Sequence, residues 1–177
     1  LTVNGGDFTT TTTGSITCSG CTAGTVTMST TGNLGGGSGA ITFYNLSTSG
    51  TGTTTFSGGG TNSVLNNVSV GTGTTLNINS TISVTGSFTN TTTGIISYTA
   101  NSPVVTVSGA SVGEGSGNIT FYRLQKAGAG TTTFSGTGTN TVNDTLDATA
   151  GTFTLSNAIT VTRDVSASTA ATLNQNE

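Results

Sequence analysis

The chain has 177 residues, enough for one domain with a core, but Leu, Ile, Val and Phe together supply only 37 of them. Charged residues make up 5% and the net charge is -3, which excludes both the highly charged composition of disordered chains and a basic surface for nucleic acid. No apolar run reaches the roughly 18 residues of a membrane-spanning helix. Thr supplies 45 residues and Gly 28, so the composition predicts an all-β chain of short strands and tight turns.

Strand-like segments recur from the first residue to the last. Residues 1–3, 41–43, 82–84, 119–121 and 159–161 are examples, each alternating an apolar residue with Thr or Ser. This two-residue period is typical of a strand with one buried face. Gly, Asn and Ser separate the segments, as turns require.

The strongest internal similarity links residues 37–62 with residues 115–140. The two stretches, GSGAITFYNLSTSGTGTTTFSGGGTN and GSGNITFYRLQKAGAGTTTFSGTGTN, agree at 19 of 26 positions, and the second begins 78 positions after the first. Weaker matches extend the repeat, with a period that varies by a few positions around this value. The chain therefore divides into copies at about 1–81 and 82–158 and a partial third copy at 159–177.

A repeat of this length is too long for one supersecondary element, but four coils of about 19–20 residues would account for it. Each coil has too few apolar residues to offset its own ordering entropy of about 1–2 kcal/mol per residue, so it must stack on the next coil. We therefore expect residues 1–177 to form one continuous β-solenoid. The alternative is a pair of tandem β-sandwiches, one for each repeat unit.

The repeated residues also suggest a family. Between residues 118 and 162 the chain reads N-I-T-F-Y-x-L, G-T-T-T-F-S-G, T-x-x-V and G-T-F-T-L-S-N-A-I-T-V-T in succession. This pattern resembles the repeats of large bacterial surface proteins, including filamentous-haemagglutinin-like adhesins and autotransporter passengers. The resemblance implies a β-solenoid that serves as a stalk, fibre or adhesive rod. It implies no catalytic residues, because such repeats have no fixed ones.

The two cysteines form a single C-x-x-C motif at Cys18 and Cys21. A redox motif would place the first thiol at a helix N-terminus, whereas the surrounding sequence predicts strand and loop. A zinc site would need two further ligands, and the chain has no His and no other Cys. We predict a local disulfide that holds a turn in an oxidising compartment, and we expect no metal or cofactor.

Asp144 and Asp147 form the closest pair of carboxylates, and paired carboxylates are the catalytic groups of glycosidases. With Arg163 they are the best candidates for an active site. The first copy, however, has Asn66 and Ser69 at the positions of the two carboxylates, and the chain has neither His nor Trp. We therefore expect no enzymatic activity.

Thr runs raise the question of ice binding, because an ordered Thr array on a solenoid could bind ordered water. The runs are Thr9 to Thr13, Thr53 to Thr55, Thr91 to Thr93 and Thr131 to Thr133. They return only once or twice in each repeat unit, whereas an ice-binding face needs Thr-x-Thr on every coil.

We expect a structural extracellular or cell-surface protein, a subunit or segment of a fibre, stalk or filament built by end-to-end stacking of coils. The alternative is an adhesin or binding module for a glycan, a host surface or ice. The chain begins directly on a repeat strand, which predicts a segment of a longer rod or a protomer that polymerises with itself. Tyr44 and Tyr122 follow the inward-facing Phe43 and Phe121, so we expect both tyrosines to point outward and make lateral contacts.

Overall fold

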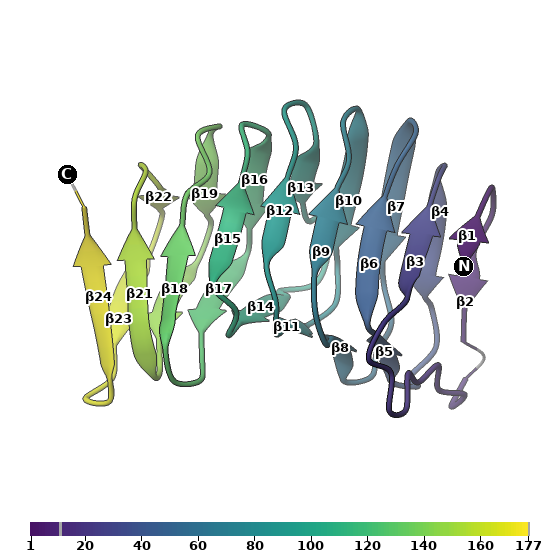
Figure 1. The fold of residues 1–177 in the computed structure, drawn as a ribbon, viewed down its shortest axis with the longest axis horizontal. Helices are drawn as coiled ribbons and strands as arrows, with labels where there is room; N and C mark the ends of the chain where they lie inside the picture. Colours follow the sequence, from purple (N-terminus) through teal and green to yellow (C-terminus); the bar gives the residue numbers. More distant parts are fainter. Residues whose placement is uncertain (11, 177) are drawn as a thin grey trace.

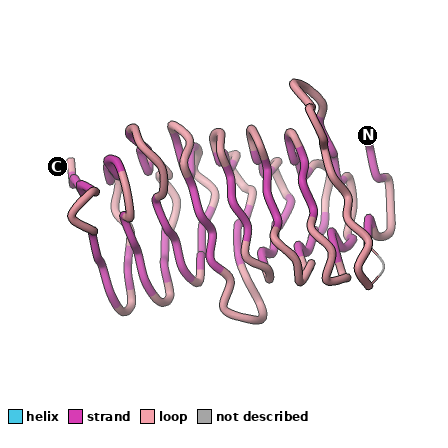
Figure 2. Tube along the Cα trace, turned by 90° about the horizontal axis from the view of Figure 1, so that it is seen from below, coloured by secondary structure: helices cyan, strands magenta, loops and turns pink. Residues whose placement is uncertain are grey.

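The computed structural model describes residues 1–10 and 12–176, so Thr11 and Glu177 lie outside the described residues. The described chain contains strands, turns and loops and no helix (Figure 2). Parallel strands wind into a solenoid of about 8 turns with about 21 residues per coil, and the coils stack side by side along the rod (Figure 1). The predicted β-solenoid is confirmed. The tandem-sandwich alternative is wrong, because sandwiches are built from antiparallel sheets.

Three parallel sheets run along the rod, and each complete coil contributes one strand to each sheet. In the first coil the sheet C position is held by an isolated bridge between Ile16 and Ile41. Sheet A contains β1 (Thr2–Val3), β3 (Thr25–Met28), β6 (Asn45–Thr48), β9 (Val68–Val70), β12 (Phe88–Asn90), β15 (Ser111–Glu114), β18 (Thr131–Phe134), β21 (Gly151–Leu155) and β24 (Ala171–Gln175). Sheet B contains β2 (Phe8–Thr9), β4 (Gly32–Gly35), β7 (Gly52–Phe56), β10 (Thr74–Ile78), β13 (Ile95–Ser97), β16 (Asn118–Phe121), β19 (Asn140–Val142) and β22 (Thr160–Val161). Sheet C contains β5 (Ile41–Phe43), β8 (Asn62–Val64), β11 (Ile82–Val84), β14 (Val104–Val107), β17 (Arg123–Lys126), β20 (Thr145–Ala148) and β23 (Asp164–Ala167).

The core consists of inward-facing side chains that stack from coil to coil. In sheet A one inward column is apolar from the second coil to the eighth and reaches Gln175 in the last coil, and its apolar members are Val26, Leu46, Val68, Phe88, Val112, Phe134 and Leu155. Burial of one such side chain contributes about 1.5–3 kcal/mol. Because each coil has few of them, stability depends on covering both sides of every coil by its neighbours.

The outward columns of sheet B are mostly polar but not uniformly Thr, and one of them contains Ile95, which is 41% exposed. In sheet B one column reads Asn33, Thr55, Asn77 and Ser97 along successive coils, and a second run reads Thr120, Thr141 and Thr160. The described strands of this sheet carry no charged residue. Since Asn and Ser interrupt the first of these columns, the described strands of this sheet do not repeat Thr on every coil.

The structure corrects the expected relation between the sequence repeat and the coils. Residues 41–43 form β5 in sheet C, whereas their counterparts in the second copy form part of β16 in sheet B. The same shift moves β6 of sheet A to β17 of sheet C, and β7 of sheet B to β18 of sheet A. The repeat therefore advances by eleven strands, or three and two-thirds coils. The expected four coils per unit is wrong because the coils are longer than expected, at about 21 residues per coil.

The advance of three and two-thirds coils per repeat unit decides on which face of the rod equivalent side chains lie. Each repeat copy is turned by one face relative to the copy before it, so the twin stretches lie on different faces and do not stack on one another. A position would return to its own face only after three units, which span eleven coils. Eleven coils correspond to about 53 Å at the usual strand spacing of about 4.8 Å.

Lys126 is the one charged side chain that faces inward from sheet C in the described part of the chain. It is 0% exposed, and its column places Val107 before it and Ala148 after it. Its ammonium group donates hydrogen bonds to the carbonyl oxygens of Ala127 at 2.7 Å, Gly128 at 2.6 Å and Ala150 at 3.3 Å. Desolvation by burial lowers the pKa of Lys126 below its ordinary value of 10.5.

The stability contributed by residue 126 should therefore depend on pH. Between the lowered folded-state pKa and 10.5, the unfolded chain holds a proton on Lys126 that the folded chain does not. In this window the free energy of unfolding rises with pH. We compare the wild type with Lys126→Thr, since the equivalent residue in the first copy is Thr48, which is also buried. Urea denaturation should show that the wild type gains stability relative to the variant as the pH is raised towards 10.5. A difference in the free energy of unfolding that stays constant with pH would contradict the lowered pKa of Lys126.

Candidate functional site

Tyrosine, arginine, aspartate and asparagine side chains gather at the corner where the chain passes from sheet B to sheet C. Four successive coils turn here, after β13, β16, β19 and β22. We call this corner the B–C corner. Its side chains are Tyr98, Tyr122, Arg123, Asn143, Asp144, Asp147, Arg163 and Asp164.

Ion pairs connect three successive coils of this corner. Asp144 lies between the two arginines: its Oδ2 is 3.4 Å from Arg123 Nε, and its Oδ1 accepts a hydrogen bond from Arg163 Nη1 at 2.9 Å. Arg123 Nη2 is also 3.8 Å from Asp147 Oδ2, and Arg163 Nε is 3.4 Å from Asp164 Oδ2. The Asp144 side chain is 10% exposed and the Arg163 side chain 70% exposed, so the carboxylate is the sheltered partner. The hydrogen bond and charge of Asp144, with the charge of Asp164, raise the pKa of Arg163 above its ordinary value.

Two tyrosines extend the corner towards the middle of the rod. The rings of Tyr98 and Tyr122 pack edge to face with centroids 5.5 Å apart and planes at 78°. Asn143 Nδ2 donates a hydrogen bond to the Tyr98 hydroxyl at 2.7 Å, which spans two coils. Both rings are half-buried, so each keeps part of its surface open to solvent.

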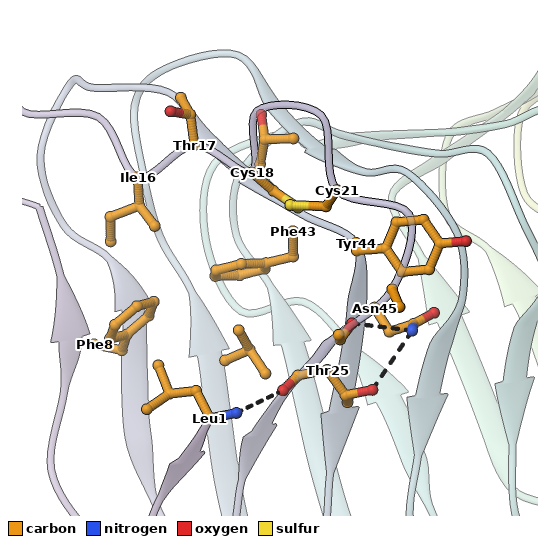
Figure 3. Close-up of a pocket in the computed structure, with 14 residues that line it drawn as sticks. Leu1, Phe8, Ile16, Thr17, Cys18, Cys21, Thr25, Phe43, Tyr44 and Asn45 are labelled. Carbon is orange, nitrogen blue, oxygen red and sulfur yellow. Dashed lines mark hydrogen bonds between the residues drawn. A yellow bond between two sulfur atoms is a disulfide. The ribbon is translucent and has the colours of Figure 1, made fainter.

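The first repeat unit forms an equivalent corner with neutral residues. Tyr44 lies where the chain passes from sheet C to sheet A, beside the bonded sulfur atoms of Cys18 and Cys21 (Figure 3). Asn45 occupies the position of Arg123, and its Oδ1 accepts a hydrogen bond from Nδ2 of Asn66 at 2.9 Å. Asn66 occupies the position of Asp144. A neutral Asn–Asn pair thus stands where the second unit has an Arg–Asp ion pair.

Cys18 and Cys21 are joined by a disulfide with their Cα atoms 5.5 Å apart. The bond closes the loop that leads into β3 and lies at the level where the second unit has Tyr98. Both features therefore support the tyrosine of the following coil. Labelling of the unfolded, non-reduced protein with a thiol reagent should detect no free cysteine. Detection of two free thiols would contradict the disulfide.

The comparison of the two corners shows which side chains the fold does not require. Five of the nine charged residues of the chain lie at the B–C corner. The first-unit corner forms the same strand–turn–strand path with Asn45, Asn66 and Ser69 at the positions of Arg123, Asp144 and Asp147. The charges of the B–C corner are therefore additional to what the turn itself needs.

This comparison predicts a non-additive pair of substitutions. Asp144→Asn alone leaves Arg123 without one carboxylate, and Arg123→Asn alone leaves the sheltered Asp144 with fewer donors, so each should lower the free energy of unfolding. The double substitution Arg123→Asn with Asp144→Asn recreates the Asn45–Asn66 pair. It should cost less than the sum of the two single changes, with a coupling energy of about 0.5–3 kcal/mol in a double-mutant cycle. Strict additivity would contradict a direct pairing.

The structure brings together some of the expected candidates and separates others. Asp144, Asp147 and Arg163 do converge, and each carboxylate is held in ion pairs with arginine. Tyr44 and Tyr122 lie at different corners, which bound sheet C on its two sides, and both are half-buried. Their role in lateral contact stays a prediction.

Arg123, Asp164 and the Tyr98–Asn143 pair were not identified from the sequence. The observed coil length of about 21 residues places Arg123 directly beside Asp144 on the next coil. The shorter coil expected from the repeat would instead have placed Arg123 one or two positions away from this carboxylate.

Other kinds of site have little support in the described residues. They contain no group of three or more His, Cys, Asp or Glu side chains placed to hold a metal ion. They also include no helix of the length and apolarity that a membrane crossing by a helix demands. Comparison with family models, with curated proteins and with solved structures finds no match to this chain.

Proposed function

We propose that this chain is a rod-forming structural module of an extracellular or cell-surface protein, a segment or subunit of a fibre, stalk or filament. The observation that carries the proposal is the continuity of three parallel sheets along the described chain. A solenoid of this kind lengthens by one strand spacing, about 4.8 Å, for every coil that is added. About 8 turns correspond to a rod of roughly 38 Å.

Apolar side chains line the outer sides of the first and last described coils, and such surfaces suit stacking on a further coil. At the first coil a cavity of about 330 Å³ is lined by residues that include Leu1, Phe8 and Ile16. At the last coil a cavity of about 420 Å³ is lined mainly by aliphatic side chains, including Val165 and Leu173. Such surfaces are stabilised when another coil covers them, whether it belongs to the same chain or to a second copy.

The location outside the cell rests on the disulfide and on the composition. A disulfide persists in oxidising compartments and is rare in the cytosol of most organisms. Only 5% of residues are charged, so little electrostatic repulsion opposes association of neighbouring rods. Both features suit an exported fibre component.

Electron microscopy and analytical ultracentrifugation of the purified chain test end-to-end stacking. The wild type should form filaments or a concentration-dependent series of oligomers. Leu173→Asp places a charge in the terminal apolar cavity and should abolish association, whereas Thr141→Asp on the outer face of sheet B should not. A wild-type chain that remains monomeric at high concentration, without filaments, would contradict the stacking.

An adhesin or binding module is the second candidate function. It is favoured by the B–C corner, because the tyrosines and ion pairs there exceed what the turn requires. The two functions are compatible, since a rigid rod can display a binding surface along its side.

A further inference from the structure

We propose that the B–C corner is a binding site for a neutral oligosaccharide. The inference rests on the second candidate function, a binding module, for which it names the ligand, and it does not depend on end-to-end stacking. It rests on the juxtaposition of the Tyr98 and Tyr122 rings with Arg123, Asp144 and Arg163 on neighbouring coils.

The first argument is the comparison between the two repeat units. The corner at Tyr44 makes the same turn with neutral side chains and a disulfide. The fold alone therefore does not explain why the later corner gathers two of the three tyrosines and five of the nine charged residues. A ligand would explain both at once.

The second argument is the chemistry of the side chains. A sugar ring has an apolar face of C–H groups, which packs on aromatic rings, and hydroxyl groups that both donate and accept hydrogen bonds. Tyr98 and Tyr122 supply the rings, and their packing against each other holds them in place. Guanidinium groups donate hydrogen bonds and carboxylates accept them. The side chains of Arg123 and Arg163 are 41% and 70% exposed, so both arginines retain N–H donors for a ligand.

The third argument concerns charge. The corner has two arginines and three aspartates, so its formal charge is -1 and every guanidinium already faces a carboxylate. A polyanion such as a nucleic acid or a sulfated glycan needs an excess of positive charge, which is lacking here. A neutral ligand with many hydroxyl groups matches the alternating donors and acceptors.

The arrangement also sets the shape of the ligand. The contributing coils follow one another at about 4.8 Å along the rod, so the corner spans four coils and about 14 Å from Tyr98 to Arg163. A linear oligosaccharide of several units would lie along this edge, with its rings on the tyrosines and its hydroxyls on the ion pairs. We expect a dissociation constant of about 1 mM, in the range of weak binding.

The test is a titration of the isotopically labelled chain with neutral hexasaccharides, followed by NMR. The probes are cellohexaose, xylohexaose, mannohexaose and maltohexaose, with hexagalacturonate and a heparin hexasaccharide as anionic comparisons. At least one neutral probe should shift the signals of residues at the B–C corner and leave those around Tyr44 unchanged. Tyr122→Leu keeps an apolar side chain against Tyr98 and should weaken binding at least about tenfold, the change expected when one ring contact is lost.

Two further variants separate loss of the ligand site from loss of the fold. Arg123→Asn with Asp144→Asn copies the neutral corner of the first unit and should fold but bind at least about tenfold more weakly. Tyr44→Leu, at the equivalent corner, should bind like the wild type.

Three results would overturn the proposal. They are the absence of shifts with every neutral probe, binding of the anionic probes alone, and equal loss of binding in Tyr44→Leu and Tyr122→Leu.

Discussion

Phe134→Ala should lower the free energy of unfolding by about 3–5 kcal/mol, the cost of deleting a fully buried aromatic ring and leaving a cavity. The Phe134 side chain is 0% exposed in β18, between Val112 of the preceding coil and Leu155 of the following one. Its ring also lies against Gly113, where an added Cβ would be 3.3 Å from two of its atoms. Neighbouring coils cannot close the cavity, because their ladder hydrogen bonds hold the strand spacing.

The matched comparison is Phe8→Ala in the first coil. Phe8 is only half-buried, and its ring centroid is 5.9 Å from that of Phe43. We expect the free energy of unfolding to fall by about 1–2 kcal/mol, because the Phe8 ring buries less apolar area on folding than the Phe134 ring does. Urea denaturation followed by circular dichroism measures both values, and equal losses would contradict the assignment of Phe134 to the closed part of the core.

Gly115→Ala should also destabilise the protein strongly, by about 2–5 kcal/mol, as the sum of backbone strain and steric overlap. Gly115 follows β15 with a φ of +115°, a conformation that side chains with a Cβ rarely adopt. The added Cβ would overlap the carbonyl oxygen of Asn90 in the preceding coil. Because that oxygen belongs to the backbone of a packed coil, it cannot move without displacing the strand.

Gly130→Ala isolates the contribution of the backbone conformation. Gly130 has a φ of +91°, but no described atom lies within 4 Å of an added Cβ. Only the strain of about 1–2 kcal/mol should therefore appear. The same denaturation series measures the difference between the two glycines, and if Gly130→Ala cost as much as Gly115→Ala, close approach of coils would not be the reason for Gly115.

Much of the site could be predicted as a set of residues but not as an arrangement. The sequence predicts Asp144 and Asp147, with Arg163, as the best candidates for an active site, and Tyr122 as an outward-pointing residue for lateral contact. Their meeting at one corner depends on the coil length, because a small error in the length of each coil moves a side chain away from its partner on the next coil. Tyr98 and Asn143 were missed for the same reason, since their hydrogen bond crosses two coils.

The buried Lys126 illustrates a second kind of limit. Its position alternates correctly with Leu124, so the pattern alone would place it inward, yet a lysine is rarely buried unless its charge is compensated. Compensation comes from three carbonyl oxygens, one of them on the next coil. No feature of the local sequence indicates those acceptors.

The sequence by itself determined that the chain is all-β and coiled, because alternation of apolar and polar residues defines the buried face of each strand and the internal similarity defines a repeat. Only the tertiary structure decided how the repeat relates to the coils. Eleven strands separate equivalent positions, and three strands make a coil, so each copy is turned by one face relative to the last. The physical reason is that stacking requires strands of neighbouring coils to pair, whichever copy they come from. Strand pairing between coils, and not similarity between copies, therefore places the tyrosines and ion pairs on one corner.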